Sequence, residues 1–415
     1  MTDGRWLASF CIARLAFGTM TTAYSGVLPL LKVDWNMTAA EAGLVQSSWH
    51  VGYLVSLLAA GFLTERFGAK RTLLGSSFAA CVFSMLFALA ADGFWSGLVL
   101  HFLAALFSGG SYTPGLTLLA ERYRPDRRGR AMGYYIAASA LGYALALVVA
   151  GFATPYIGWR GAFVLCALGP VAGTAIAFQA LRATPNVVHP HDADSAAGPT
   201  WRAVLANKPA MLLIWAYVFH SWELLGMWAW LPAYLAYAAT SGAAVTAEAV
   251  GIGALLSAIT YVGSMIGSVY GGALSDRFGR TRVILIMSCA SLACSLTLGW
   301  LVSLPLWLLV LLAVVYNITA IGDSSIYSTA LTELVPPRQI GVAYSVRSLL
   351  GFGAGAVSPW AFGVVLDLCR AHDTSPAATW GLAWGALGLG ALLGPFLTWK
   401  LRRMPAARQM ANGKR

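Results

Sequence analysis

Four ionisable residues lie deep inside long apolar stretches of this 415-residue sequence: Arg14, Glu223, Asp323 and Arg347. An ionisable side chain is costly in an apolar environment, so residues of this kind normally face a cavity or a partner and take part in function. A guanidinium offers a planar fork of donors that fits a carboxylate or a phosphate, whereas a carboxyl group can take up and release a proton. The four residues therefore indicate anion binding and proton transfer.

Glu223 shares a predicted helix face with an imidazole and an apolar wall, since His220 precedes it by three residues and Met227 and Trp230 follow at helical spacing. It lies about fourteen residues, or roughly 21 Å, into its apolar stretch, which is too deep for it to reach water by itself. We expect Glu223 and His220 to take up and release protons, a role called proton coupling below. The alternative is a buried His-Glu pair that only holds helices together.

Asp323 shares a helix face with Thr319 and Tyr327. Asp323 could accept a proton, or it could neutralise Arg347 in a purely structural pair, and both interpretations stay open here. We assign Asp323 to proton coupling and Tyr327 to substrate binding.

Arg14 and Arg347 each lie about eight residues, roughly 12 Å, from the expected cytoplasmic end of their apolar stretches. Arg14 shares a face with Thr21 and Ser25, and Arg347 shares one with Tyr344. Two buried guanidinium groups favour an organic anion as substrate. The alternative is that these long side chains extend to the membrane surface or pair with an acid.

A further polar face consists of His101, Ser108 and Tyr112, which are spaced for one side of a helix. We assign Tyr112 to substrate binding and His101 to proton coupling, although His101 could also be a hydrated residue near the outer interface. Trp230 lies in an aromatic group near Pro232 and is a candidate for substrate binding.

The composition indicates a membrane protein, because 58% of the chain is hydrophobic and only 10% is charged. Stretches of about twenty apolar residues, long enough to cross a bilayer, recur from end to end. Lipid cannot hydrogen-bond an exposed backbone, so each stretch must be helical and the fold class is all-α. The expected spans cover residues 7–31, 43–63, 72–91, 95–120, 131–154, 160–181, 209–238, 249–274, 283–302, 306–332, 340–366 and 378–399.

The net charge of +11 is explained by topology. Most Lys and Arg residues fall in alternate loops and in the two termini, and the positive-inside rule then places both termini in the cytoplasm. We expect the inner membrane of a bacterium, a small-molecule substrate, protons and the lipid bilayer as partners, a monomer, and no binding to nucleic acid.

The six cysteines are scattered and form no metal-binding spacing, so no metal, cofactor or disulfide framework is expected. No nucleophile lies beside a base in the pattern that catalysis requires. We therefore expect no enzyme.

One eleven-residue phrase occurs twice, at residues 61–71 and 272–282, with an offset of 211 residues. Residues 121–129 and 333–341 also match, at an offset of 212. The chain is therefore an internal duplication. We expect an N-terminal six-helix bundle at 1–181, a cytoplasmic loop at 182–208, and a C-terminal six-helix bundle with a short basic tail at 209–415.

The repeated phrase resembles the loop signature of the major facilitator superfamily of secondary transporters. The matching residues are Gly61, Glu65, Arg66, Gly68, Lys70 and Arg71 in the first copy, and Gly272, Asp276, Arg277, Gly279 and Arg282 in the second. The resemblance implies twelve helices in two pseudo-symmetric bundles, a substrate site near the midplane, and a conformational latch formed by these loop residues at the cytoplasmic face.

Two positions depart from the family pattern. His101 stands where helix four of the family usually has an arginine, and residues 131–154 lack the Gly-Pro motif of many drug/proton antiporters. We therefore expect secondary active transport of a small organic anion by alternating access, with proton symport. The alternatives are proton-driven efflux of amphiphilic compounds and a transporter-like membrane sensor.

Overall fold

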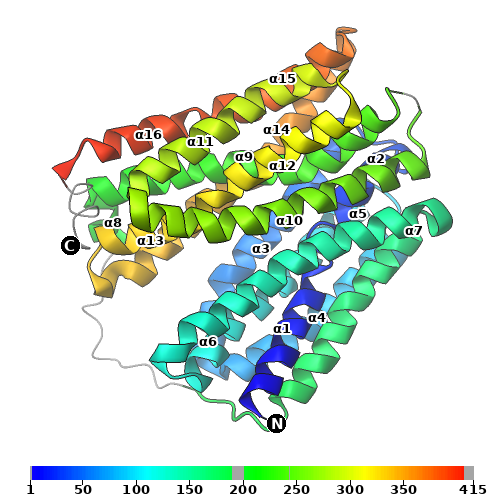
Figure 1. Ribbon diagram of the computed structural model, residues 1–415. Helices are drawn as coiled ribbons and strands as arrows, with labels where there is room; N and C mark the ends of the chain where they lie inside the picture. Colours follow the sequence, from blue (N-terminus) through cyan, green and yellow to red (C-terminus); the bar gives the residue numbers. More distant parts are fainter. Residues whose placement is uncertain (1, 189–200, 243, 406–415) are drawn as a thin grey trace. The chain divides into compact units, whose positions relative to one another are not determined.

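The computed structural model describes residues 2–188, 201–242 and 244–405, and within these ranges the chain forms helices and no strand (Figure 1). The predicted all-α fold class is confirmed. The first helices are α1 (Asp3–Gly18), α2 (Ala23–Asp34), α3 (Ala39–Phe67), α4 (Ala69–Ala90), α5 (Phe94–Ser108), the 3-10 turn η1 (Gly109–Ser111), α6 (Tyr112–Arg122) and α7 (Pro125–Leu181). The remaining helices are α8 (Trp201–Ala206), α9 (Lys208–Ala239), α10 (Ala247–Phe278), α11 (Arg280–Thr297), η3 (Leu298–Leu301), α12 (Leu306–Gly322), α13 (Ser324–Leu334), η4 (Pro337–Gln339), α14 (Ile340–Ala371), α15 (Pro376–Ala391) and α16 (Leu393–Arg402).

Nine helical segments in the described ranges are long and apolar enough to cross a membrane. One of them includes most of α7, which has 57 residues, or about 85 Å of helix, and so far exceeds a hydrocarbon core of about 30 Å. The backbone of α7 is non-helical at Gly158, where φ is 67° and ψ is 177°. This break separates the two spans predicted at 131–154 and 160–181. Every predicted span lies mostly on helix, which is consistent with twelve crossings.

Several predicted spans consist of two shorter helices, and two of the breaks hold residues of the candidate site. The span at 95–120 is interrupted by η1, which ends at Ser111. The span at 306–332 is interrupted at Asp323, which ends α12 and precedes α13. Because the residues at a break leave the regular helical hydrogen-bond pattern, their side chains can be aimed at neighbouring helices.

The two copies of the repeated phrase make the same sharp turn between helices. Gly68 lies between α3 and α4 with φ 84°, and Gly279 lies between α10 and α11 with φ 90°. A residue with a Cβ is strained at such φ values, so glycine at these positions has a backbone reason. At the other end of α3, Thr38 and Glu41 form a capping box that starts the helix.

The chain forms two compact units, and each is described separately. The first unit comprises Met1–His191 with Pro232–Tyr261, and the second comprises Asp192–Leu231 with Val262–Arg415. The predicted boundary in the central loop remains a prediction, and residues 189–200 of that loop and 406–415 of the basic tail lie outside the described residues.

Each unit has an aromatic-rich hydrophobic core that surrounds candidate site residues. In the first unit the core includes Phe10 and Tyr135, whose rings stack with centroids 4.9 Å apart. In the second unit it includes Tyr217 and Tyr327, whose rings meet edge to face at 5.7 Å. These rings restrict the charged side chains beside them.

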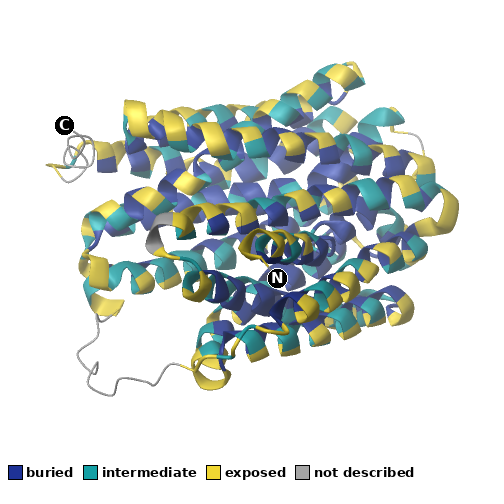
Figure 2. Ribbon diagram, turned by 60° about the horizontal axis from the view of Figure 1, so that its bottom comes forward, coloured by how far each residue is buried: buried dark blue, intermediate teal, exposed yellow. Residues whose placement is uncertain are grey.

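Exposed positions alternate with buried ones along the same helices (Figure 2). Many of the exposed side chains are large and apolar, including Phe62 at 76%, Trp95 at 74% and Trp307 at 69%. Apolar surface of this kind is expected where a helix faces lipid.

Candidate functional site

Arg14 of α1 is buried in the first unit, with 4% of its surface exposed. Its Nε donates to the Ser139 hydroxyl at 2.6 Å and its Nη1 donates to the Ser111 hydroxyl at 2.8 Å. The guanidinium lies 5.0 Å from the ring centroid of Tyr112 and 5.6 Å from that of Tyr135. The structure thus brings the predicted residues Arg14 and Tyr112 together, and the alternative that Arg14 extends to the membrane surface is wrong.

Arg14 forms no ion pair with any carboxylate in the described part of the chain. Hydroxyl groups and aromatic faces stabilise a buried cation, but they do not compensate its charge. The burial of this uncompensated charge is therefore costly in the free protein. An anion bound at the guanidinium would supply both the missing charge and acceptors for its remaining donors.

His101 of α5 is completely buried, so the alternative of a hydrated interfacial residue is wrong. Its Nδ1 lies 2.9 Å from the carbonyl oxygen of Val45, and because a carbonyl can only accept, Nδ1 carries the proton. The ring packs against Tyr24, Trp49 and Phe87 at centroid distances of 5.0 to 5.2 Å. Its Nε2 has no hydrogen-bond partner among the described residues. The assignment of His101 to proton coupling remains a prediction.

Asp323 of the second unit lies next to His220 of α9, and both are buried. The Nδ1 atom of His220 is 3.0 Å from Oδ1 of Asp323, although that oxygen accepts no well-aligned hydrogen bond. The predicted alternatives paired His220 with Glu223 and Asp323 with Arg347. Among the described residues His220 makes its ion pair with Asp323, across α9 and the α12–α13 break, while it interacts with Glu223 only at longer range, and no ion pair joins Asp323 to Arg347.

Glu223 is also buried, with 4% of its surface exposed. Its Oε2 accepts a hydrogen bond from the Ser291 hydroxyl of α11 at 3.1 Å. Its Oε1 is buried and accepts no well-aligned hydrogen bond in the described ranges, although the Tyr316 hydroxyl lies near enough to interact with this carboxyl group. A proton on Oε1 would turn this unpaired acceptor into a donor.

Arg347 of α14 lies in an environment similar to that of Arg14. Its Nη1 donates to the Ser328 hydroxyl at 2.6 Å, and its guanidinium lies 4.5 Å from the ring centroid of Tyr217 and 4.8 Å from that of Tyr344. Its Nε is buried and has no acceptor among the described residues. Arg347 therefore retains a free donor.

The remaining aromatic candidates pack within the second unit. The ring of Tyr327 lies 5.4 Å from that of His220, and its buried hydroxyl has no partner in the described chain. Trp230 is 2% exposed, stacks on Phe362 at 5.2 Å and donates from Nε1 to the Pro359 carbonyl at 2.8 Å. The indole donor of Trp230 is therefore already used by the protein, and its substrate-binding assignment remains a prediction.

The first copy of the predicted latch is held by the start of the central loop. The Asn186 side chain donates to the Phe67 carbonyl at 2.8 Å and accepts from the Arg71 backbone N–H at 3.1 Å, so it bridges the α3–α4 turn. The Nζ of Lys70 donates to the Thr184 carbonyl at 2.8 Å. These contacts fix the loop at Gly68, and its role as a latch stays a prediction.

The second copy is held by charges within its own unit. Arg280 of α11 lies 2.6 Å from Asp276 and 3.1 Å from Glu333, and it also donates to Ser275 at 2.7 Å. Sequence reasoning missed Arg280 and Glu333, because the first copy has Ala69 at the position of Arg280.

The duplication would have identified the missed partners of the two arginines. The offset of 212 places Tyr135 opposite Arg347, and alignment of Pro29 with Pro232 places Arg14 opposite Tyr217. The structure contains both contacts, Arg14 over Tyr135 and Arg347 over Tyr217. The same Arg-Tyr pair therefore occurs in each unit with its two members exchanged.

The protein-family model of the Major Facilitator Superfamily matches residues 10–359 of the chain. The chain belongs to the Major Facilitator Superfamily. Membership confirms the resemblance of the loop motifs and the assignment as a transporter rather than an enzyme. This member of the superfamily is accordingly a multi-pass membrane protein that moves a small molecule.

Relatives and solved structures agree with this classification. The chain is 26% identical to the "Probable 4-methylmuconolactone transporter" of Cupriavidus pinatubonensis, over 80% of this chain and 77% of that one. It is 25% identical to the "Cis,cis-muconate transport protein" of Acinetobacter baylyi, over 86% and 87% of the two chains. The fold is similar to that of a bacterial homolog of the human lysosomal transporter Spinster, with a TM-score of 0.75, 17% identity and 99% coverage of both chains.

Proposed function

We propose that this transporter carries a small organic anion with one or more carboxylates by alternating access, in symport with protons. The observation that carries the proposal is the buried, uncompensated guanidinium of Arg14. The relatives named for muconate and methylmuconolactone support a carboxylate rather than the amphiphilic compounds of the efflux alternative.

The anion-binding half of the proposal rests on the geometry around Arg14. The serine hydroxyls occupy Nε and Nη1, and neither brings a negative charge. A carboxylate at the guanidinium would form a charge-assisted hydrogen bond in a dry environment, where such contacts are strongest. The rings of Tyr112 and Tyr135 limit how the ligand can approach. Arg347, with its free Nε, is the second arginine that we assign to the substrate.

The proton-coupling half rests on the second unit. Glu223, His220 and Asp323 form a buried group in which Oε1 of the glutamate accepts no well-aligned hydrogen bond and lies near the Tyr316 hydroxyl. An unpaired carboxyl oxygen in a dry site is costly, and a proton is the smallest ligand that satisfies it. We assign the transported proton to Glu223, with His220 and Asp323 as its neighbours.

The proposed setting is the inner membrane of a bacterium, with both termini in the cytoplasm and one chain as the functional unit. Its support is the distribution of Lys and Arg residues in alternate loops.

Uptake into proteoliposomes tests the proposal directly. Purified protein is reconstituted, and accumulation of labelled cis,cis-muconate is measured with and without an inward proton gradient. We expect accumulation above the external concentration only with the gradient, and its loss in an Arg14→Met variant. Gradient-driven export of amphiphilic dyes, with no uptake of any carboxylate in a panel, would instead support the efflux alternative. No flux of any solute would support the sensor.

A further inference from the structure

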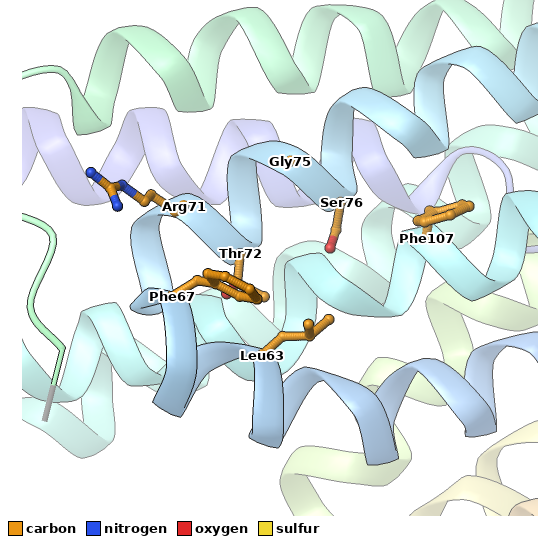
Figure 3. A pocket seen from close by; sticks show the side chains of 7 residues that line it. All are labelled: Leu63, Phe67, Arg71, Thr72, Gly75, Ser76 and Phe107. Atoms are coloured by element: carbon orange, nitrogen blue, oxygen red, sulfur yellow. The ribbon is translucent and has the colours of Figure 1, made fainter. Parts of the chain in front are cut away.

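A groove of about 300 Å³ lies on the first unit where α3, α4 and α5 meet (Figure 3). Its lining is apolar apart from two hydroxyl groups and one arginine. The lining residues are Leu63 and Phe67 of α3, Arg71, Thr72, Gly75 and Ser76 of α4, and Phe107 of α5.

The walls of the groove are well supported by the protein. Phe107 stacks on Phe83 with ring centroids 5.3 Å apart and nearly parallel planes. Leu63 and Phe67 are 39% and 45% exposed, as expected for side chains that face lipid. Gly75 adds no side chain, and a Cβ built on it would meet nothing within 4 Å. The space beside Gly75 can therefore be occupied by a bound molecule.

Arg71 is the charged residue of the groove, and its guanidinium is uncommitted. Its backbone N–H binds Asn186, but its side chain makes no hydrogen bond, ion pair or ring contact with the described residues. In Figure 3 the Arg71 side chain lies at the α3–α4 turn and points away from Leu63, Phe67 and Phe107. A cation at the end of an apolar groove is complementary to a ligand with an anionic head and a hydrocarbon tail.

We propose that this groove binds one anionic phospholipid of the cytoplasmic leaflet, with its phosphate at Arg71 and an acyl chain between α3 and α4. Basic pockets between helices on the cytoplasmic side are suited to anionic headgroups. The leaflet follows from the orientation proposed above, but binding measured in detergent does not depend on orientation or on transport.

The second repeat offers an internal comparison. At an offset of 211 residues it keeps the arginine of the turn, as Arg282, but it has Ile286 and Met287 in place of Gly75 and Ser76. Met287 packs toward Gly322, with its sulfur 3.3 Å from where a Cβ on that glycine would lie. Replacing Gly75 with isoleucine, the residue at the corresponding position of the second repeat, should therefore fill the groove with a side chain that this fold already accommodates.

Native mass spectrometry of the full chain in detergent tests the proposal, with dioleoyl phosphatidylglycerol and dioleoyl phosphatidylcholine as probes. We expect one phosphatidylglycerol to be retained in preference to phosphatidylcholine. Arg71→Gln should reduce that preference about 5-fold, the effect of about 1 kcal/mol expected for one cation near a lipid surface. Gly75→Ile should abolish retention of both lipids, and it should fold because isoleucine is a better helix former than glycine.

Arg282→Gln is the matched control, because it removes the corresponding cation of the second repeat. It should leave retention unchanged. Equal losses in Arg71→Gln and Arg282→Gln would overturn the proposal in favour of general surface attraction. Retention that survives Gly75→Ile would also overturn it. Inorganic phosphate should neither compete with the lipid nor raise the melting temperature, and competition by it would show a free-anion site instead.

Discussion

Replacement of Arg14 by methionine separates a ligand-binding arginine from a structural one. If Arg14 holds the first unit together, its removal should destabilise the protein. If Arg14 instead binds the anionic substrate, its removal should leave the fold intact and weaken ligand binding. The contacts around Arg14 are specific enough to give a magnitude for each outcome.

The expected cost to stability is small. The Ser139 hydroxyl also contacts the Tyr135 carbonyl at 3.4 Å, and the Ser111 hydroxyl donates to the Ser108 carbonyl at 2.7 Å, so both keep an acceptor after the substitution. The two hydrogen bonds to the serine hydroxyls and the interaction with Tyr53 contribute about 1 kcal/mol each. Removal of a buried cation that lacks a counter-charge offsets much of this cost. We expect the melting temperature to change by less than about 3 °C.

The expected cost to binding is large. Loss of a desolvated contact between an arginine and a carboxylate costs about 2 to 4 kcal/mol, or roughly 30- to 1000-fold in Kd. Calorimetry with cis,cis-muconate gives the Kd, and differential scanning fluorimetry gives the melting temperature. Ser139→Ala is the control, since it keeps the charge and removes one hydrogen bond, and it should weaken binding by no more than about 10-fold. A drop of about 10 °C in melting temperature with unchanged Kd for every carboxylate would refute the reasoning.

Three further predictions concern the second unit and the loops. Glu223→Gln should abolish gradient-driven accumulation but preserve counterflow of labelled anion, and persistence of gradient dependence would place the proton elsewhere. Gly68→Ala should lower the melting temperature by about 2 to 4 °C, because a φ of 84° costs an alanine about 1 kcal/mol or more. Gly61→Ala is the control and should be neutral, since nothing lies within 4 Å of its Cβ position. Arg280→Met removes the cation that Asp276 and Glu333 both contact and should cost about 1 to 2 kcal/mol in stability, measured as a fall in melting temperature that Arg282→Met does not reproduce.

The helices could be predicted from the sequence, but the partners of the buried charges could not. Hydropathy over about twenty residues located stretches that are helical in the described chain, because lipid permits only helices there. The pairing of His220 with Asp323 depends on the rotation of α9 and on the break between α12 and α13, and neither is encoded in local periodicity. The face of one helix suggested the pair His220 with Glu223, and opposite charge on two helices suggested Asp323 with Arg347, but neither is an ion pair among the described residues.

The duplication carries the information that single helices lack, because the two units have the same contacts but different chemistry. With Pro29 aligned on Pro232, the counterparts of His220 and Glu223 are Phe17 and Met20. The offset of 212 gives Ser111 as the counterpart of Asp323.

The counterparts of the second unit's acids and imidazole in the first unit, Phe17, Met20 and Ser111, are thus not proton carriers near neutral pH. Arg14 corresponds to Tyr217. If the two repeats had the same function, we would expect the charged residues that differ between them to be distributed without preference for one unit. Instead the first unit holds a cation beside hydroxyl groups, and the second holds the buried acids as well as Arg347. This division favours a first unit specialised for the anion and a second unit specialised for the proton. It also predicts that Met20→Glu, which copies Glu223 into the first unit, should add a buried acid to the unit that holds Arg14 and reduce anion affinity without changing proton dependence.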